Sequence, residues 1–218
     1  MTYAARLTQR FILAGLVICI LCGAGAVTAA DLPNILWLTS EDNSPYLGCY
    51  GDEQAYTPNL DRLASEGVRY ANAFANAPVC SAARSTLIMG MHAPSLGIHN
   101  HRSSVRIPEQ FQTYPEVLRA AGYYCTNNSK TDYNMVQDRK DYWDESSTTA
   151  HYRNRKLGQP FFAVFNTTLS HEGQLTYEIV EQRRKDGTLP ATPRIAPEDV
   201  VLPPYHADTP VVRRDWSV

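Results

Sequence analysis

The sequence predicts an α/β fold with a largely parallel central sheet flanked by helices, because short apolar runs alternate with segments that carry helix signals. Three apolar runs of strand length each directly follow Gly or Pro: 34–40, 123–128 and 159–168. Three further segments each end at Gly, which commonly stops a helix: 57–67, 80–90 and 113–122. The chain of 218 residues is long enough for one domain with a proper core.

The first part of this pattern starts with "NILWLTS" at 34–40, which predicts a buried strand opening the mature protein. A helix is expected at 57–67, with Thr57 as a candidate N-cap and Pro58 at the first helical position. The segment "VRYANAFA" at 68–75 predicts a second strand or an extended stretch.

The second part starts with "SAARSTLIMG", which predicts a helix that begins at or just after Cys80 and ends at Gly90. The segment 113–122 repeats the pattern of a cap, an early Pro and a final Gly, and a strand is expected directly after it at 123–128. "QPFFAVFNTT" at 159–168 gives the strongest strand signal of the chain.

The C-terminal stretch has a different composition and predicts an extended linker or loop. Between 187 and 210 it has little periodicity and many prolines: Pro190, Pro193, Pro197, Pro203, Pro204 and Pro210. No compact closing element is expected at the final "RRDWSV".

Residues 1–30 have the pattern of a secretory signal peptide. Arg6 and Arg10 precede the apolar "FILAGLVICILCGAGAV", and "VTAAD" offers a small-residue cleavage site after Ala30. We therefore expect an exported protein, in the periplasm or outside the cell, with no membrane segment in its mature form. An uncleaved membrane anchor is the alternative, although the apolar run is short for a span.

Charge and cysteine content narrow the function classes. The formal net charge of −2 provides no basic surface on which to argue for nucleic acid or membrane binding. Outside the leader the cysteines are odd in number: Cys49, Cys80 and Cys125. In an oxidising compartment at least one thiol therefore lacks an internal partner.

Two groups of residues carry candidate chemistry. Glu41 and Asp42 follow the first strand, where ligands of α/β sheets bind, and adjacent carboxylates suit Ca²⁺ or Mg²⁺; the alternative is a pair of solvated loop carboxylates. Cys80 is expected at a helix N-terminus, which lowers the pKa of a thiol and favours anions, with Arg84 on the same helix face. This layout suits an anionic substrate; a buried cysteine with a surface arginine is the alternative.

The string "CSAAR" followed by "STLIMG" resembles the signature of the sulfatase family. The surrounding "PNILWLTSEDNSPYLGCYGD", "TPNLDRLASEGVRYANAFANAPVC" and "PEVLRAAGY" also resemble the amino-terminal half of a secreted sulfatase, from Pro33 to His171. The resemblance implies an alkaline phosphatase-like sandwich, with residues 31–186 as the N-terminal part of the catalytic domain. It also implies that 187–218 is a Pro-rich extended segment of that domain and that the C-terminal remainder is missing.

The resemblance implies that Cys80 is oxidised to formylglycine by a formylglycine-generating enzyme or an equivalent maturase. The hydrated aldehyde would attack sulfur, and its second hydroxyl would later expel sulfate. Arg84 would orient the hydrated aldehyde, and Lys130 would contact both the hydrate and the sulfate. His171 would contact the sulfate or protonate the leaving alcohol.

The resemblance also implies a divalent metal, Ca²⁺ with Mg²⁺ as the alternative, bound by Glu41, Asp42 and the modified Cys80. The second pair of metal ligands in such enzymes would lie beyond Val218, so part of the site is expected here. One departure concerns the residues after Lys130: the family often has Trp-His there, whereas this chain has Thr131-Asp132. His99 and His101 are candidates for the missing histidine.

The sequence thus predicts a sulfuric ester hydrolase, or a sulfamate hydrolase, that acts on a sulfated small molecule or polysaccharide, with carbohydrate as the expected class. Two alternatives stay open. One is a phosphoester or phosphonate hydrolase of the same superfamily, since sulfate and phosphate are both tetrahedral anions. The other is an inactive truncated remnant.

Overall fold

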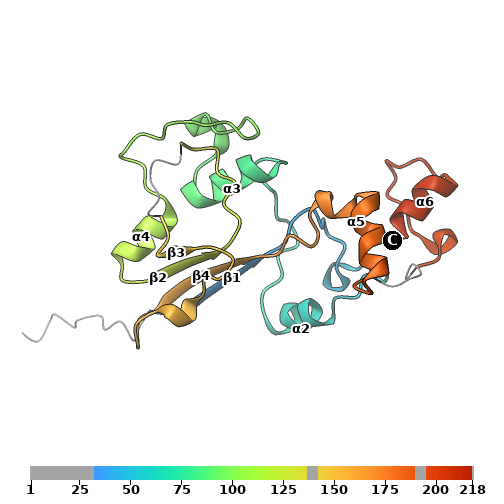
Figure 1. The fold of residues 1–218 in the computed structure, drawn as a ribbon, viewed down its shortest axis with the longest axis horizontal. Helices are drawn as coiled ribbons and strands as arrows, with labels where there is room; N and C mark the ends of the chain where they lie inside the picture. Colours follow the sequence, from blue (N-terminus) through green and yellow to red (C-terminus); the bar gives the residue numbers. More distant parts are fainter. Residues whose placement is uncertain (1–31, 137–141, 190–194, 218) are drawn as a thin grey trace, which may run out of the picture.

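A computed structural model describes residues 32–136, 142–189 and 195–217 of the chain. The expected signal peptide at 1–30 lies outside the described residues. At the centre is a four-stranded sheet in the order β1-β4-β2-β3, with every pairing parallel (Figure 1). Its strands are β1 (Ile35–Thr39), β2 (Tyr124–Asn128), β3 (Glu145–Ser146) and β4 (Phe161–Asn166). The predicted fold class and the three main strands are confirmed.

Five α-helices lie in the described residues: α2 (Pro58–Glu66), α3 (Cys80–Met89), α4 (Tyr114–Ala120), α5 (Tyr177–Lys185) and α6 (Pro210–Trp216). Short 3-10 helices lie before and between them: η2 (Gly48–Tyr50), η3 (Ala93–Leu96), η4 (Tyr152–Asn154), η5 (Glu172–Leu175) and η6 (Pro197–Asp199). Helices α2, α3 and α4 match the predicted segments, and the local signals explain where they stop and start. Gly90 ends α3 with a left-handed φ of 61°, and Thr113 forms a capping box with Glu116 at the start of α4.

The core lies between one face of the sheet and helices α3 and α4, which pack above it in Figure 1. Because side chains alternate along a strand, Trp37, Cys125, Phe162 and Val164 share this face through the register that aligns Trp37 with Val164. Ile88 of α3 is 1% exposed and closes the core from above. The carboxyl ends of β1, β4 and β2 therefore lie side by side beneath the start of α3.

The prediction of a buried strand at 34–40 was wrong in one respect. In β1, Leu36 and Leu38 are 53% and 62% exposed, whereas Trp37 between them packs against the core. β1 is an edge strand, and within the described residues these two leucines point to the sheet face opposite α3 and α4. The run of apolar letters is thus half-buried rather than buried on both faces.

The segment 68–75 was predicted as a second strand or an extended stretch. It forms no strand but an exposed, irregular stretch, which agrees with the second alternative. Its apolar side chains Val68, Tyr70 and Phe74 are 83%, 70% and 90% exposed.

The prediction that the chain lacks a closing element was wrong, because α6 forms at Pro210–Trp216. Thr209 caps that helix by accepting a hydrogen bond from the Val212 backbone nitrogen at 3.3 Å.

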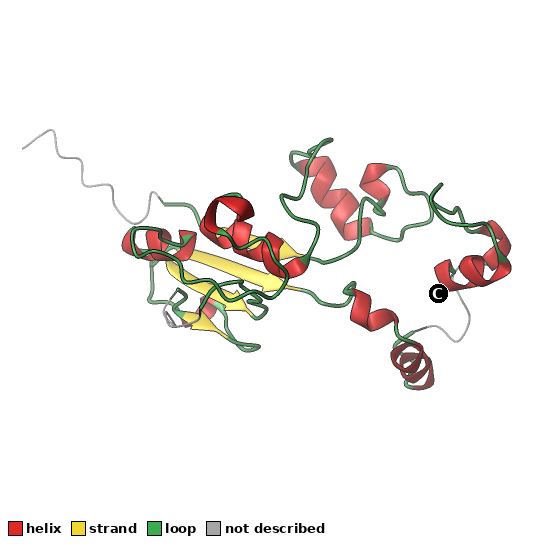
Figure 2. Cartoon of the chain, turned by 90° about the horizontal axis from the view of Figure 1, so that it is seen from above, coloured by secondary structure: helices red, strands yellow, loops and turns green. Residues whose placement is uncertain are grey.

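Helices α5 and α6 lie away from the sheet, to its right in Figure 1, and Figure 2 likewise shows helices well separated from the strands on that side. Helix α5 begins only a few residues after η5, which itself follows the end of β4. None of the helices in the described ranges has the length and apolar character of a membrane span.

Candidate active site

A ladder of polar side chains crosses the carboxyl ends of three parallel strands. Thr39 of β1 donates from Oγ1 to Oδ1 of Asn166 in β4 at 2.8 Å, and Asn166 donates from Nδ2 to Oδ1 of Asn127 in β2 at 2.9 Å. All three side chains lie on the face that α3 covers, because their positions continue the alternation of Trp37, Val164 and Cys125. The ladder forms the floor of the candidate site.

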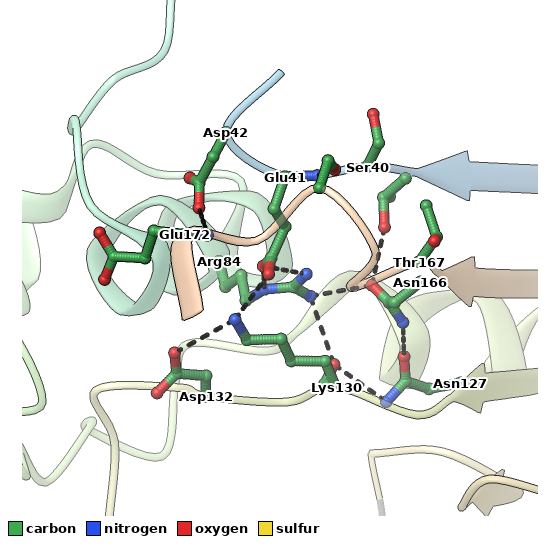
Figure 3. A network of polar contacts seen from close by, with 12 residues as sticks. Ser40, Glu41, Asp42, Arg84, Asn127, Lys130, Asp132, Asn166, Thr167 and Glu172 are labelled. Atoms are coloured by element: carbon green, nitrogen blue, oxygen red, sulfur yellow. Dashed lines mark hydrogen bonds and ion pairs between the residues drawn. The ribbon is translucent and has the colours of Figure 1, made fainter. Parts of the chain in front are cut away.

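Glu41 is a buried carboxylate held by two cations above this floor (Figure 3). Arg84 donates to its Oε1 from Nε at 3.0 Å and from Nη2 at 2.7 Å, and Lys130 contacts its Oε2 through Nζ at 2.8 Å. Burial alone would raise the pKa of Glu41, but the hydrogen bonds and charges of Lys130 and Arg84 outweigh burial and lower this pKa. Glu41 is therefore ionised in the folded protein at neutral pH.

Arg84 links the helix to the strand ends with its whole guanidinium group. Besides binding Glu41, its Nη1 donates to Oδ1 of Asn166 at 2.9 Å and to the carbonyl oxygen of Lys130 at 3.3 Å. Its side chain is only 13% exposed. A planar group with several donors is suited to hold partners from three separate segments at once.

Lys130 and Asp132 lie on the loop that follows β2. The side-chain nitrogen of Lys130 is 3.9 Å from Oδ2 of Asp132, in addition to its close contact with Glu41. Asp132 has a left-handed φ of 51°, a region in which Asp is one of the few common non-glycine residues. Figure 3 shows both side chains directed toward the centre of the network.

Cys80 is the first residue of α3, as predicted, and its thiol is free. The expectation that the helix N-terminus lowers the pKa of this thiol was wrong. Burial is the largest influence and raises the pKa, the neighbouring Asp132 raises it further, and Lys130 only partly opposes them. The thiol is therefore predominantly protonated at neutral pH, which does not favour a reaction through a thiolate.

The other free thiols lie elsewhere. Cys125 is fully buried in the core, where burial raises its pKa to about 12, and Cys49 is part of η2. The expectation that at least one thiol lacks a partner is confirmed, because Cys49, Cys80 and Cys125 are all free.

The loop after β4 closes one side of the site through backbone contacts. Oγ of Ser170 accepts a hydrogen bond from the Glu41 backbone nitrogen at 3.2 Å, and Oδ2 of Asp42 accepts one from the Glu172 backbone nitrogen at 2.9 Å. His171 lies between these two contacts, and its Nδ1 accepts from the Gly173 backbone nitrogen at 3.1 Å. This bond fixes the ring and leaves Nε2 as the nitrogen available to a ligand.

His99 and His101, the candidates for the missing histidine, occupy exposed positions in the loop after η3. Nδ1 of His101 lies 3.0 Å from Oγ of Ser81, the residue next to Cys80. No hydrogen bond or ion pair of His99 is recorded in the described part of the chain. Of this pair, only His101 reaches the residues around Cys80, and it does so through Ser81.

A small pocket, partly open to solvent, extends from the charged network toward the core. Arg84, Lys130 and Asn166 line its polar end, and Tyr114 and Trp143 contribute aromatic walls. The apolar walls of the pocket lower the local dielectric constant, which strengthens the electrostatic interactions of the network.

The described residues do not assemble a complete metal site. Ca²⁺ takes about six to eight oxygen ligands, whereas both carboxylate oxygens of Glu41 are already bound by Arg84 and Lys130. Asp42 is exposed and directs Oδ2 to the Glu172 nitrogen. No group of three His, Cys, Asp or Glu side chains in the described ranges could hold a metal ion.

Of the predicted site residues, Glu41, Arg84 and Lys130 form one network, and Cys80 lies close enough for Asp132 and Lys130 to influence the pKa of its thiol. Asp42 and His171 lie on the loops at its edge. Sequence reasoning missed Asn127 and Asn166 and gave Asp132 no role. The same rule that singled out Glu41 would have found both asparagines, since each lies at the carboxyl end of a predicted strand.

Comparisons with known proteins identify the family of the chain. The family model Sulfatase matches residues 33–199. The ulvan-active sulfatase of Formosa agariphila is 37% identical over 226 residues, covering 86% of this chain and 38% of that protein. Human iduronate 2-sulfatase is 35% identical over 122 residues, covering 53% of this chain and 22% of that protein. The chain thus spans well under half the length of these relatives.

Solved structures show the same fold at low sequence identity. One, in complex with its substrate D-glucosamine-2-N,6-O-disulfate, has a TM-score of 0.55 at 21% identity and covers 64% of this chain and 35% of that chain. A 2-O GAG sulfatase has a TM-score of 0.54 at 20% identity and covers 66% and 36%. These proteins have the alkaline phosphatase-like fold. Because the family model matches most of its length, the chain belongs to the sulfatase family.

Proposed function

We propose that the protein hydrolyses a sulfate ester of a sulfated carbohydrate. The observation that supports this most is the convergence of Arg84, Lys130 and the first residue of α3, Cys80, at the carboxyl edge of a parallel sheet in a sulfatase-family chain. Two cations beside a helix N-terminus form a site for a tetrahedral anion.

Cys80 is proposed as the precursor of the nucleophile, formylglycine, which supplies a hydrated aldehyde that can be sulfated and then regenerated. The raised pKa of the unmodified thiol is consistent with this role, because a protonated thiol is a poor nucleophile. Oxidation of Cys80 requires a formylglycine-generating enzyme or an equivalent maturase as a partner. We also propose that the protein is exported by means of the signal peptide at 1–30.

Arg84 is proposed to orient the side chain at position 80 from the same helix, one turn further on. Lys130 is proposed to bind both that side chain and the sulfate, since its ammonium group lies between Glu41 and Asp132. His171 is proposed to donate a proton from Nε2 to the leaving alcohol, with Nδ1 fixed by the Gly173 nitrogen.

A divalent ion, Ca²⁺ or Mg²⁺, is part of the proposal, with Glu41 and Asp42 as its carboxylate ligands and the modified Cys80 beside them. When bound, the ion would act as a Lewis acid toward sulfate oxygens. Glu41 would have to release at least one of its two cations to bind it. Oxygen donors other than these two carboxylates would also be needed.

The carbohydrate class is proposed from the relatives. The Formosa agariphila protein is an ulvan-active sulfatase, and N-acetylgalactosamine-6-sulfatase of Homo sapiens is 36% identical over 113 residues, covering 46% of this chain and 22% of that protein. An exported enzyme also meets polysaccharides. We therefore propose a sulfated polysaccharide, or an oligosaccharide derived from one, as the substrate.

The test is the release of inorganic sulfate from a panel of sulfated polysaccharides and oligosaccharides, by protein purified from its own host. Phosphate release from 4-nitrophenyl phosphate is measured in parallel, because the same fold could serve a phosphoester hydrolase. Sulfate release well above phosphate release is the expected result. Dominant phosphate release, or no release of either anion by protein that carries formylglycine, would contradict the proposal.

A further inference from the structure

Asn166, the last residue of β4, uses the full hydrogen-bonding capacity of its side-chain amide (Figure 3). Its Oδ1 accepts from Thr39 Oγ1 at 2.8 Å and from Arg84 Nη1 at 2.9 Å. Its Nδ2 donates to Asn127 Oδ1 at 2.9 Å and to the Asn128 carbonyl oxygen at 3.1 Å. An asparagine amide has two acceptor sites and two donor hydrogens, so these contacts occupy all four. The side chain is therefore held in one orientation.

The partners also decide which end of the amide faces helix α3. A guanidinium group carries only donors, so the atom of Asn166 that faces Arg84 must be the oxygen. The carbonyl of Asn128 only accepts, so the atom that faces it must be the nitrogen. The sheet fixes the backbone beneath both contacts, because Asn166 pairs with Thr39 and Phe165 pairs with Asn128. The acceptor for Arg84 thus belongs to a regular strand in the middle of the sheet.

Arg84 is held on two sides, and the two sides differ. Nε and Nη2 donate to Glu41, which lies beyond the end of β1 and also binds Lys130. Nη1 donates to Asn166 and to the carbonyl oxygen of Lys130. Within the described residues these contacts use four of the five N–H groups: one on Nε, two on Nη1 and one on Nη2. The remaining N–H, on Nη2, is available to a ligand.

A neutral amide holds the guanidinium group without cancelling its charge. A carboxylate at position 166 would form an ion pair with Arg84. It would also place an oxygen against the acceptor oxygens of Asn127 and Asn128, which now receive hydrogen bonds from Nδ2. The amide of Asn166 avoids both effects. The positive charge of Arg84 therefore stays available to a tetrahedral anion.

We propose that Asn166 is a positioning residue for sulfate-ester hydrolysis, which holds the guanidinium group of Arg84 in the plane that orients the side chain at position 80. This inference rests on the proposed function, because Asn166 acts through the role proposed there for Arg84. It assigns a part in the reaction to a residue that does not itself contact the substrate. Misplacement of a reacting group by about 1 Å can lower a rate by about 10²-fold, so loss of this contact should be visible in the kinetics.

Three substitutions isolate the contact. Asn166→Ala removes all four hydrogen bonds of the amide. Asn166→Ser keeps a hydroxyl for the neighbouring strands, but its oxygen is one bond closer to the backbone and does not reach Arg84; it is the second variant if Asn166→Ala does not fold. Asn154→Ala is the matched control, since Nδ2 of Asn154 in η4 donates to both carboxylate oxygens of Glu145 at 3.0 Å, away from Arg84.

The measurement is a double-mutant cycle with Arg84→Lys, using steady-state hydrolysis of 4-nitrophenyl sulfate. It uses the full protein with confirmed formylglycine content, at a temperature below the unfolding midpoint of every variant. Both Asn166 variants should lower kcat about 10- to 100-fold and change KM by about twofold or less, because the reacting group is misdirected while substrate binding is kept. In the Arg84→Lys background, the same substitutions should lower kcat by about twofold or less. Asn154→Ala should match wild type.

An equal loss of kcat in both backgrounds would overturn the proposal, because Asn166 would then act independently of Arg84. Wild-type kinetics of both Asn166 variants would also overturn it, as would a rise in KM at unchanged kcat, which would assign the residue to substrate binding. If neither variant folds, Asn166 is required for stability and the positioning role is rejected. Wild-type protein that carries formylglycine but cleaves neither this ester nor any sulfated saccharide would reject the proposed function and this inference with it. That outcome is seen in wild type alone and is distinct from the others.

Discussion

Arg84 and Glu41 are 43 residues apart in the sequence, and two hydrogen bonds of 3.0 and 2.7 Å join the guanidinium group to one carboxylate oxygen. The other oxygen of Glu41 contacts Lys130, so three charges from the segment after β1, helix α3 and the loop after β2 share one buried cluster. Exposed ion pairs contribute little to stability, but breaking a buried pair leaves a charge without compensation. Loss of one of these charges should therefore both destabilise this edge of the sheet and disturb the geometry of the site.

Glu41→Gln should destabilise the protein by about 3 kcal/mol, because Arg84 and Lys130 would keep their charges in a buried place without a counter-ion. The measurement is the free energy of unfolding from a urea titration in EDTA at pH 7. Glu66→Gln is the matched control, since its partner Arg62 and Glu66 itself are 70% and 61% exposed. The control should change stability by less than about 0.5 kcal/mol. Equal effects of the two variants would contradict the account.

The pH dependence of stability should reflect the lowered pKa of Glu41. A group whose pKa is lower in the folded state stabilises the protein above its unfolded pKa, and this contribution is lost as the pH falls through the folded value. The loss should therefore occur below about pH 4.5, the ordinary value for this carboxyl. In EDTA, the midpoint of urea unfolding should fall less steeply below this pH for Glu41→Gln than for wild type. Parallel curves would contradict the prediction.

Much of the fold could be predicted from the sequence because local signals mark the element ends. The helix start at Cys80 and the stop at Gly90 follow from backbone preferences of neighbouring residues, and so does the capping box at Thr113. Helix α5 escaped prediction because "YEIVEQRRK" has no apolar stripe, and only Val180 of that helix is buried. Strand β3 has two residues, too few to give a periodic signal.

The exposure of β1 could not be predicted because it depends on tertiary neighbours. The letters of "NILWLTS" describe an apolar strand, but only the order of strands shows that β1 is an edge strand with Leu36 and Leu38 exposed. The same limit applies to the thiol of Cys80. A helix N-terminus favours a low pKa, whereas burial and Asp132, which is far from Cys80 only in the sequence, raise the pKa of this thiol.

Arg84→Lys should lower kcat/KM for sulfate-ester hydrolysis by about 10²-fold or more, because a single ammonium group cannot bind Glu41, Asn166 and the Lys130 carbonyl together. The measurement is steady-state kinetics on protein with confirmed formylglycine content. Arg62→Lys on α2 provides the matched control at an exposed arginine and should behave as wild type. A near-normal rate for Arg84→Lys would mean that Arg84 is outside the catalytic site.

Cys80→Ala should abolish turnover while leaving the fold intact, because the precursor of the nucleophile is removed and Ala is the best helix former. The measurements are sulfate release and the midpoint of thermal unfolding. Cys49→Ala is the control, since it removes a free thiol from η2 and should retain activity. Sulfatase activity in folded Cys80→Ala protein would refute the assigned nucleophile.

The state of residue 80 in the native protein tests the account most directly. The measurement is a mass spectrum of the tryptic peptide Tyr70–Arg84, from protein produced in its own host. The account predicts a mass shift that matches conversion of the Cys80 thiol to an aldehyde. An unmodified thiol, from a host that matures other sulfatases, would contradict a role of this residue in sulfate-ester hydrolysis.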